Sequence, residues 1–131
     1  VAEVRALTET VKVSQFTDGG STVGTKTMTG FIPAGAVILG SKVTVEDGFA
    51  GDTTAALTIG DGSDVDRYNT STIDLFTTAA TGVQSGVPSG SKLQIAAVQP
   101  VLTVTSSADF TSVVSNGAGK ATISVYYIET K

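Results

Sequence analysis

The sequence predicts an all-β protein, an antiparallel β-sandwich of jelly-roll type with about eight strands. Thr, Val and Ile dominate, and Leu-rich segments with helical periodicity are absent. These β-branched residues have stiff side chains that suit a pleated sheet. Apolar and polar residues alternate repeatedly, and turn signals rich in Gly, Pro, Asp and Asn separate the alternating segments. The length of 131 residues suits one domain, residues 1–131.

The first sixteen residues differ from the later segments. Val1–Phe16 contains no proline and only two large apolar anchors, Leu7 and Phe16. We therefore predict a strand over Val4–Phe16. We hypothesise that residues 1–16 form an extended arm that adds to a neighbouring subunit through backbone hydrogen bonds.

Seven further segments are predicted as strands because they alternate or are rich in β-branched residues and end at turn signals. Asp18-Gly19 and Asn116-Gly117 are the strongest hairpin candidates. The stretch Thr77–Ser91 is small, polar and uncharged, which predicts a long exposed loop. The seven segments are Lys26–Ile32, Ala36–Glu46, Ala55–Ile59, Thr72–Thr77, Lys92–Val98, Val101–Thr105 and Lys120–Glu129.

The C-terminal third contains one predicted helical turn, Ser107–Ser112. Ser106 or Ser107 could cap it, and Asp109 would favour the positive end of its dipole. In the strand that follows, alternate residues from Ala121 to Tyr127 form an apolar face, and we expect this strand to be covered on both sides near its end.

The aromatic residues are spread along the chain near predicted strand ends, which is typical of side chains that close the space between two sheets. We expect Tyr68 to anchor the acidic turn before it. Tyr126 and Tyr127 point to opposite faces of one strand, so at least one should lie at an interface or on the surface. The predicted core phenylalanines are Phe16, Phe31, Phe49, Phe76 and Phe110.

Composition argues against several classes of function. The net charge is −4 and the pI is about 4.5, so the surface would repel phosphate and we expect no nucleic-acid partner. No apolar run is long enough to span a bilayer, and no signal peptide is visible. The chain has neither cysteine nor histidine, which excludes Ser-His-Asp and Cys-His arrangements. We predict a protein that is not an enzyme, with no catalytic residues, no metal site and no cofactor.

The stretch GDGSDVDRYNT (residues 60–70) carries the one concentration of possible chemistry, Asp61, Asp64 and Asp66. Calcium loops place acidic ligands at alternate positions and end with a further acid, and this spacing does not match. The preferred interpretation is a turn in which aspartate side chains accept hydrogen bonds from nearby backbone N–H groups. A bound cation is the alternative, and the sequence leaves it open.

The run IPAGAVILGSKVTVEDGFAGDTTAALTIGDGSDVDRY (32–68) and the C-terminal GKATISVYYIE resemble a pattern in structural proteins of tailed bacteriophages. The resemblance extends from about Phe31 to Glu129 and depends on the positions of turn residues more than on functional residues. It implies a small β-sandwich or jelly-roll virion protein on the capsid surface that decorates and stabilises the shell. The implied partner is the major capsid protein, bound by a homotrimer. The resemblance also suggests that the arm at residues 1–16 could add to the capsid protein instead of to a neighbouring subunit.

Two alternatives remain at this point. A phage head-fibre or tail-associated module that binds a receptor or carbohydrate has a similar composition, but this chain has few aromatic residues to stack on sugars. An enzyme is disfavoured by the absence of histidine and cysteine.

Overall fold

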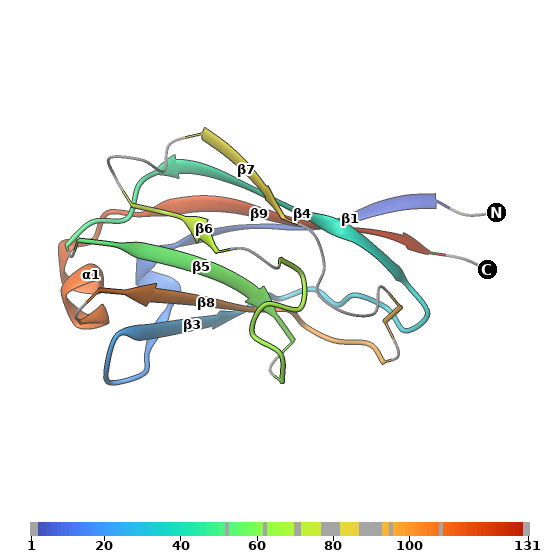
Figure 1. Ribbon diagram of the computed structural model, residues 1–131, viewed down its shortest axis with the longest axis horizontal. Coiled ribbons are helices and arrows are strands. Elements are labelled where there is room, and N and C mark those ends of the chain that lie inside the picture. The colour runs from blue at the N-terminus through green and yellow to red at the C-terminus, as the bar shows by residue number, and fades with distance from the viewer. Residues whose placement is uncertain are drawn as a thin grey trace.

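The computed structural model of the protein consists of two antiparallel β-sheets that face each other (Figure 1). It describes residues 3–51, 53–61, 63–69, 72–76, 82–86, 93–94, 96–107 and 109–129. These residues form nine strands, one 3-10 helix and one α-helix. Their bounds are β1 Glu3–Lys12, η1 Val13–Gln15, β2 Thr17–Asp18, β3 Val23–Thr27, β4 Val37–Asp47, β5 Ala55–Gly60, β6 Ile73–Asp74, β7 Gly82–Gly86, β8 Val101–Ser106, α1 Phe110–Asn116 and β9 Lys120–Glu129.

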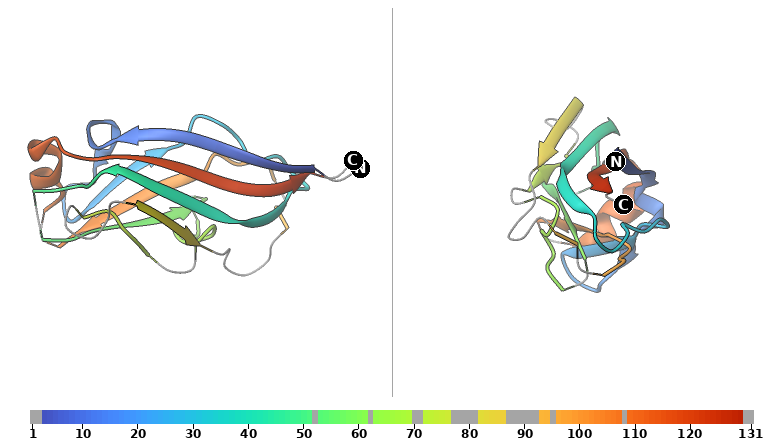
Figure 2. Two further views of the ribbon diagram at one scale, coloured as in Figure 1. Left: turned by 90° about the horizontal axis from the view of Figure 1, so that it is seen from above. Right: turned by 90° about the vertical axis from the view of Figure 1, so that its right-hand side faces the viewer.

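The strand order confirms the predicted jelly-roll sandwich. One sheet has the order β1-β9-β4-β7 and the other β2-β3-β8-β5-β6. Without the short β2, the eight remaining strands follow the order 1-8-3-6 in one sheet and 2-7-4-5 in the other, the arrangement of a jelly roll. The start of β1 and the end of β9 lie side by side at one end of the elongated molecule (Figure 2).

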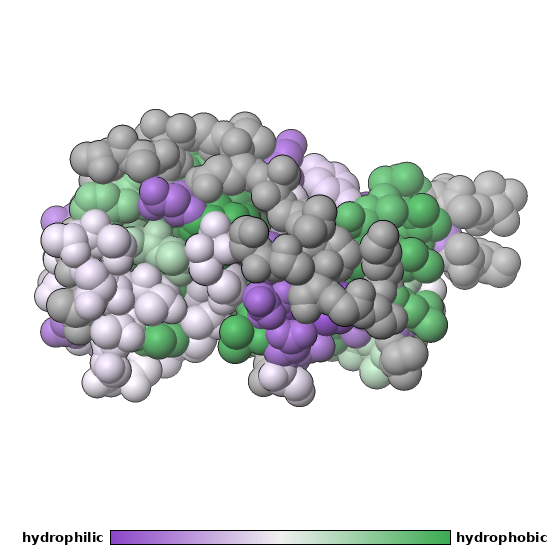
Figure 3. Space-filling model, in the orientation of Figure 1, coloured by the Kyte–Doolittle hydropathy of each residue, from purple (hydrophilic) through white to green (hydrophobic). Residues whose placement is uncertain are grey.

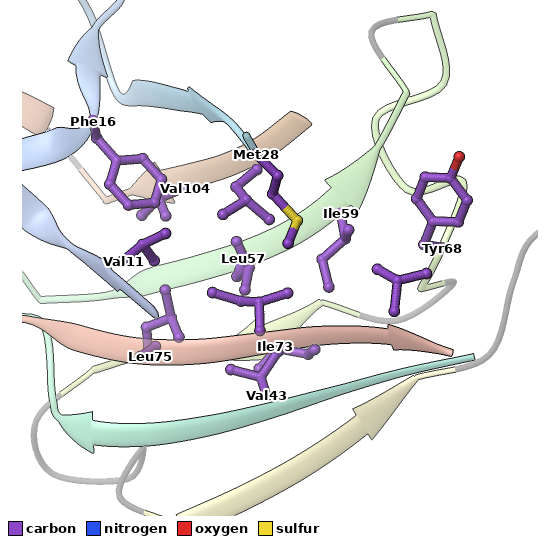
Figure 4. Close-up of a cluster of buried hydrophobic side chains, with 14 of the residues drawn as sticks. Val11, Phe16, Met28, Val43, Leu57, Ile59, Tyr68, Ile73, Leu75 and Val104 are labelled. Atoms are coloured by element: carbon purple, nitrogen blue, oxygen red, sulfur yellow. The ribbon is translucent and has the colours of Figure 1, made fainter. Parts of the chain in front are cut away.

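The core lies between the two sheets (Figure 4). The alternation predicted for β9 is observed, since Ala121, Ile123, Val125 and Tyr127 are all buried. On its other face Ser124 is buried and Tyr126 is half-buried, so the expected cover on both sides is confirmed in part.

Three of the five predicted core phenylalanines close one end of the sandwich. Phe16, Phe49 and Phe110 are buried, and the Phe16 ring centroid lies 6.0 Å from that of Phe49 and 6.2 Å from that of Phe110. Phe76 is half-buried, and its backbone forms an isolated parallel β-bridge with Phe49. The prediction for Phe31 is wrong, because its side chain is 58% exposed.

The helix begins three residues later than predicted, at Phe110 instead of Ser107, and is capped by a different residue. Asp109 is the N-cap, and its carboxylate accepts a hydrogen bond from the Thr111 N–H at 2.9 Å. Asn116-Gly117 is therefore not a hairpin. Gly117 ends the helix in the left-handed conformation (φ 79°), which glycine adopts without steric cost. The Asp18-Gly19 hairpin is confirmed, because β2 pairs with β3.

Two other predictions near the middle of the chain are wrong. The expected loop 77–91 contains β7, which pairs with β4 from Ser41↔Gly86 to Val45↔Gly82. The expected strand 92–98 forms only isolated bridges, Val37↔Leu93 and Ile32↔Val98. Between them the buried Gln94 side chain donates to the Ala96 carbonyl at 2.9 Å, and residues 92 and 95 lie outside the described part.

From Glu3 to Lys12 the predicted arm is part of the chain's own sheet, and residues 1 and 2 lie outside the described part. β1 pairs with β9 along its whole length, from Glu3↔Glu129 to Lys12↔Lys120. Residues 13–15 then form η1 instead of continuing the predicted strand to Phe16. One edge of β1 is therefore occupied within the molecule, and addition to a neighbour could use only its outer edge.

Glu9 joins the two sheets where β1 lies near β3. Its Oε1 accepts hydrogen bonds from the Thr29 N–H at 2.8 Å and the Thr29 hydroxyl at 3.0 Å, and its Oε2 lies 3.0 Å from Lys26 Nζ. Burial acts to raise the pKa of Glu9, but these hydrogen bonds and the Lys26 charge outweigh it and hold the pKa below its ordinary value.

Candidate functional site

The acidic turn follows β5 and forms as the preferred interpretation predicted. Asp61 Oδ1 accepts hydrogen bonds from the N–H groups of Ser63 at 3.0 Å and Asp64 at 2.8 Å. The Asp61 N–H donates to the Asp64 carbonyl at 3.1 Å. The aspartate side chains therefore stabilise the turn itself.

The remaining aspartates of the turn interact with each other. A hydrogen bond between the Asp64 and Asp66 carboxyl groups, followed by slight burial and charge repulsion, raises the pKa of Asp66. Within the described residues, no three acidic side chains converge to form a metal-ligating cluster. Whether Asp61, Asp64 and Asp66 bind a cation stays a hypothesis that a calcium titration would test.

Tyr68 anchors the turn, as expected. Its side chain is fully buried, its N–H donates to the Ile59 carbonyl at 2.9 Å, and its hydroxyl hydrogen bonds Gln94 Oε1 at 2.7 Å. The Ser41 hydroxyl of β4 donates to the Tyr68 carbonyl at 3.0 Å, which ties the turn to the opposite sheet. Burial raises the pKa of Tyr68 to about 12, with Arg67 opposing and Asp61 adding to the rise. Tyr68 is therefore a neutral structural anchor at physiological pH.

Asn69 provides a second anchor that sequence reasoning missed. Its side chain is fully buried, and Oδ1 accepts a hydrogen bond from the Ile59 N–H at 2.6 Å. Asparagine is so common in turns that its presence after Tyr68 did not indicate this inward orientation.

An open hollow of about 590 Å³ lies beside the turn. Arg67 lies among its lining residues, with its Nη2 donating to the Leu93 carbonyl at 3.3 Å and its guanidinium 5.3 Å from the Tyr68 ring centroid. The Gln94 side chain accepts a hydrogen bond from the Tyr68 hydroxyl and donates one to the Ala96 carbonyl. The side chains of Arg67 and Gln94 in this hollow thus bond within the protein.

A more distinctive feature is an apolar surface at the end of the molecule where β1 begins and β9 ends (Figure 3). Val4, Ile128, Val37 and Leu93 form one row across the outer face of the β1-β9-β4 sheet, because each lies opposite the next. The exposed fractions are 67% for Val4 and 46% for Leu93 of this row, and 44% for Leu39, which lies two residues after Val37 in β4. We call these three residues the terminal-end patch.

The rest of that outer sheet face carries hydroxyl and charged side chains. The side chains of Thr8 and Ser124 hydrogen bond at 2.9 Å, as do those of Thr10 and Thr122. The two halves of the face therefore differ, with apolar residues toward the termini and satisfied hydroxyl pairs away from them. Sequence alternation alone did not indicate the patch, because its members come from separate segments.

Comparison with solved structures identifies two chains of the same architecture. A chain of the cyanophage Pam1 capsid asymmetric unit matches with a TM-score of 0.60 and 17% identity, over 98% of this chain and 86% of that one. A chain of the acid-stable capsid of Helicobacter pylori bacteriophage KHP30 matches with a TM-score of 0.54 and 14% identity, over 95% of both chains. The fold is one that occurs in phage capsids.

The resemblance to phage structural proteins is thus confirmed at the level of the fold. No family model and no curated protein matches the sequence. No helix among the described residues is long and apolar enough to cross a membrane.

Proposed function

We propose that this protein is a structural component of a phage virion that decorates the capsid. In this role, a homotrimer of the protein binds the major capsid protein at the outer surface of the shell and stabilises the shell. One observation carries the proposal: nearly the whole chain shares its fold with chains of two phage capsid structures.

The terminal-end patch is the surface that best suits contact with the shell. It is apolar, and the nearby charges of Arg5 and Glu129 neutralise each other in an ion pair of 2.9 Å. Docking would remove this apolar area from water at a gain of about 25 cal/mol per Å². A stable contact needs on the order of 800 Å² from each partner, so neighbouring residues of the outer sheet face would take part.

Binding of this kind stabilises a shell by mass action. A protein that binds the assembled capsid and not its dissociated subunits shifts the equilibrium toward assembly. Three copies held together bind with avidity, so a weak contact of each copy suffices. This mechanism requires neither catalysis nor a cofactor.

The test is reconstitution on capsids that lack the protein. Wild type should co-sediment with these capsids and raise the temperature at which they release their contents, whereas Val4→Asp and Leu39→Asp should bind far less. Val65→Asp is the matched control, because Val65 is 57% exposed but lies on the acidic turn outside the patch. Failure of wild type to bind would refute the proposal, and equal loss in all three variants would refute the assignment of the patch.

A receptor- or carbohydrate-binding module is the competing function. Among the exposed large hydrophobic residues of the described part, Phe31 alone is aromatic, which is little for stacking on sugar rings. Retention of the protein by host-surface glycans and not by capsids would favour this alternative. Light scattering during size exclusion would separately test the trimer.

A further inference from the structure

β1 leaves a long strand edge without a partner in the described structure. It lies at the end of the sheet order β1-β9-β4-β7 and spans ten residues, with no proline and no shift in its register with β9. The edge strands of the other sheet, β2 and β6, have only two residues each. An edge of this length is a ready template for pairing with another strand.

The hydrogen bonds at the end of β1 show which backbone groups face outward. The Val13 N–H donates to the Gly119 carbonyl at 3.0 Å, so the odd-numbered residues form the hydrogen-bonded pairs with β9. The N–H and C=O groups of the even-numbered residues, Val4, Ala6 and Thr8 among them, therefore point away from β9. The Lys12 N–H fits this pattern, because it donates to the side-chain Oε1 of Gln15 at 2.8 Å and not to β9.

The charges on β1 restrict how a second strand could pair with it. Arg5 and Glu9 lie on the inward face of the edge strand, where charged residues usually discourage strand addition. They are four residues apart and opposite in sign, with Leu7 midway between them. In an antiparallel pair of two β1 strands, the register that places Leu7 opposite Leu7 also places each Arg5 opposite a Glu9.

We propose that the outer edge of β1 is a docking site for β1 of a second copy of this chain, paired antiparallel about a two-fold axis at Leu7. Val4 then pairs with Thr10 and Ala6 with Thr8 through the outward backbone groups. Leu7, Arg5 and Glu9 fall at the non-hydrogen-bonded positions, where opposing Cα atoms are only about 4.5 Å apart and side chains contact most closely.

The neighbouring registers are less favourable. A shift of two residues in one direction brings Glu9 opposite Glu3, and a shift in the other places Arg5 opposite Val11 and Glu9 opposite Leu7. Shifts by one residue would place the inward residues of one copy against the outward residues of the other. The same charges that oppose indiscriminate pairing thus favour this single register.

The contact is independent of the proposed capsid function. It is isologous, since each copy contributes the same edge, and it merges the two sheets into one that continues through the axis. A two-fold contact is distinct from any three-fold contact, so it would link neighbouring trimers if the protein is trimeric. The Arg5–Glu129 pair is compatible with it, because the Arg5 side chain is 48% exposed and a guanidinium carries five donors.

A cysteine scan tests the register directly, because the chain has no cysteine of its own. Leu7→Cys should form a disulfide-linked dimer on mild oxidation, since its Cα separation across the axis falls in the usual range of about 4.4–6.8 Å. Val4→Cys is the control, because Val4 is more exposed yet lies opposite Thr10. Crosslinking of Val4→Cys equal to or faster than that of Leu7→Cys would overturn the proposed register.

Sedimentation of the full chain from micromolar to millimolar concentration tests the association itself. The mass of the wild type should double with concentration, whether the starting species is a monomer or a trimer. Arg5→Glu should weaken the doubling about 3- to 30-fold, because two opposite-charge pairs become like-charge pairs. Lys12→Glu makes the same charge change outside the paired segment and should have a smaller effect. No doubling of the wild type, or equal effects of the two variants, would refute the proposal.

Discussion

Glu9→Gln tests whether a single edge carboxylate holds the two sheets together. The substitution keeps the shape of the side chain but removes its charge. In the wild type, Glu9 accepts two hydrogen bonds from Thr29 and pairs with Lys26, and the side chains of Lys26 and Glu9 are only 13% and 16% exposed. We therefore expect a measurable loss of stability from a change of one atom type.

The magnitude follows from the contacts. A hydrogen bond to a charged acceptor contributes about 1.5–3 kcal/mol, against about 0.5–1.5 kcal/mol for a neutral one, and a shielded ion pair adds up to about 1 kcal/mol. Some of the loss will be recovered because the amide oxygen still accepts from Thr29. We expect the free energy of unfolding to fall by about 1–2 kcal/mol at pH 7, or roughly 3–8 °C in Tm.

The lowered pKa of Glu9 determines how the stability difference between wild type and Glu9→Gln changes with pH. The pKa of Glu9 in the folded protein lies below the ordinary value of 4.5. Its contribution is therefore complete above the unfolded pKa and is lost as the pH falls through the folded pKa. The difference between wild type and Glu9→Gln should be largest near neutral pH and should shrink toward zero well below pH 4.5.

Urea unfolding at several pH values measures this difference, with an unchanged m-value as the check that only stability has altered. Glu46→Gln is the matched control, because Glu46 also pairs with a lysine and a hydroxyl on the same sheet but is exposed. Equal stability of wild type and Glu9→Gln at pH 7, or a difference that persists unchanged in acid, would contradict the assigned role of Glu9.

Three further predictions concern the acidic turn. Tyr68→Phe should lower the free energy of unfolding by about 1–3 kcal/mol in urea, because it leaves the buried Gln94 Oε1 without its hydroxyl donor; an unchanged midpoint would show that Gln94 finds another partner. Gly60→Ala should destabilise more than an exposed alanine substitution, since the new Cβ would lie 2.2 Å from the Asp64 carbonyl oxygen, and thermal melting measures this. Millimolar calcium should leave the Tm unchanged, because Asp61 Oδ1 already accepts two backbone N–H groups; a rise would favour the cation hypothesis.

The strands that sequence patterns located are those whose own residues carry the information. β9 alternates between apolar and small polar residues, and β5 ends at a glycine followed by an acidic turn. These signals depend on neighbours along the chain. They therefore predicted the sandwich, most of its strands and the hydrogen bonds within the acidic turn.

The errors occurred where distant partners decide the conformation. Gly82–Gly86 has little intrinsic preference for a strand, yet it forms β7 because the edge of β4 offers it backbone hydrogen bonds. Asn116-Gly117 has the composition of a hairpin turn but ends a helix, since Phe110 and Val113 gain burial against the core.

The sequence by itself determined the fold class, the Asp18-Gly19 hairpin, the acidic turn and the absence of histidine and cysteine, because these follow from residue type and spacing. Only the tertiary structure decided which residues meet. It placed Glu9 against Thr29, gathered Val4 and Leu93 on one row, and left β1 at an edge. Such contacts join segments far apart in the chain, and they are fixed by strand order and register, which local patterns do not encode.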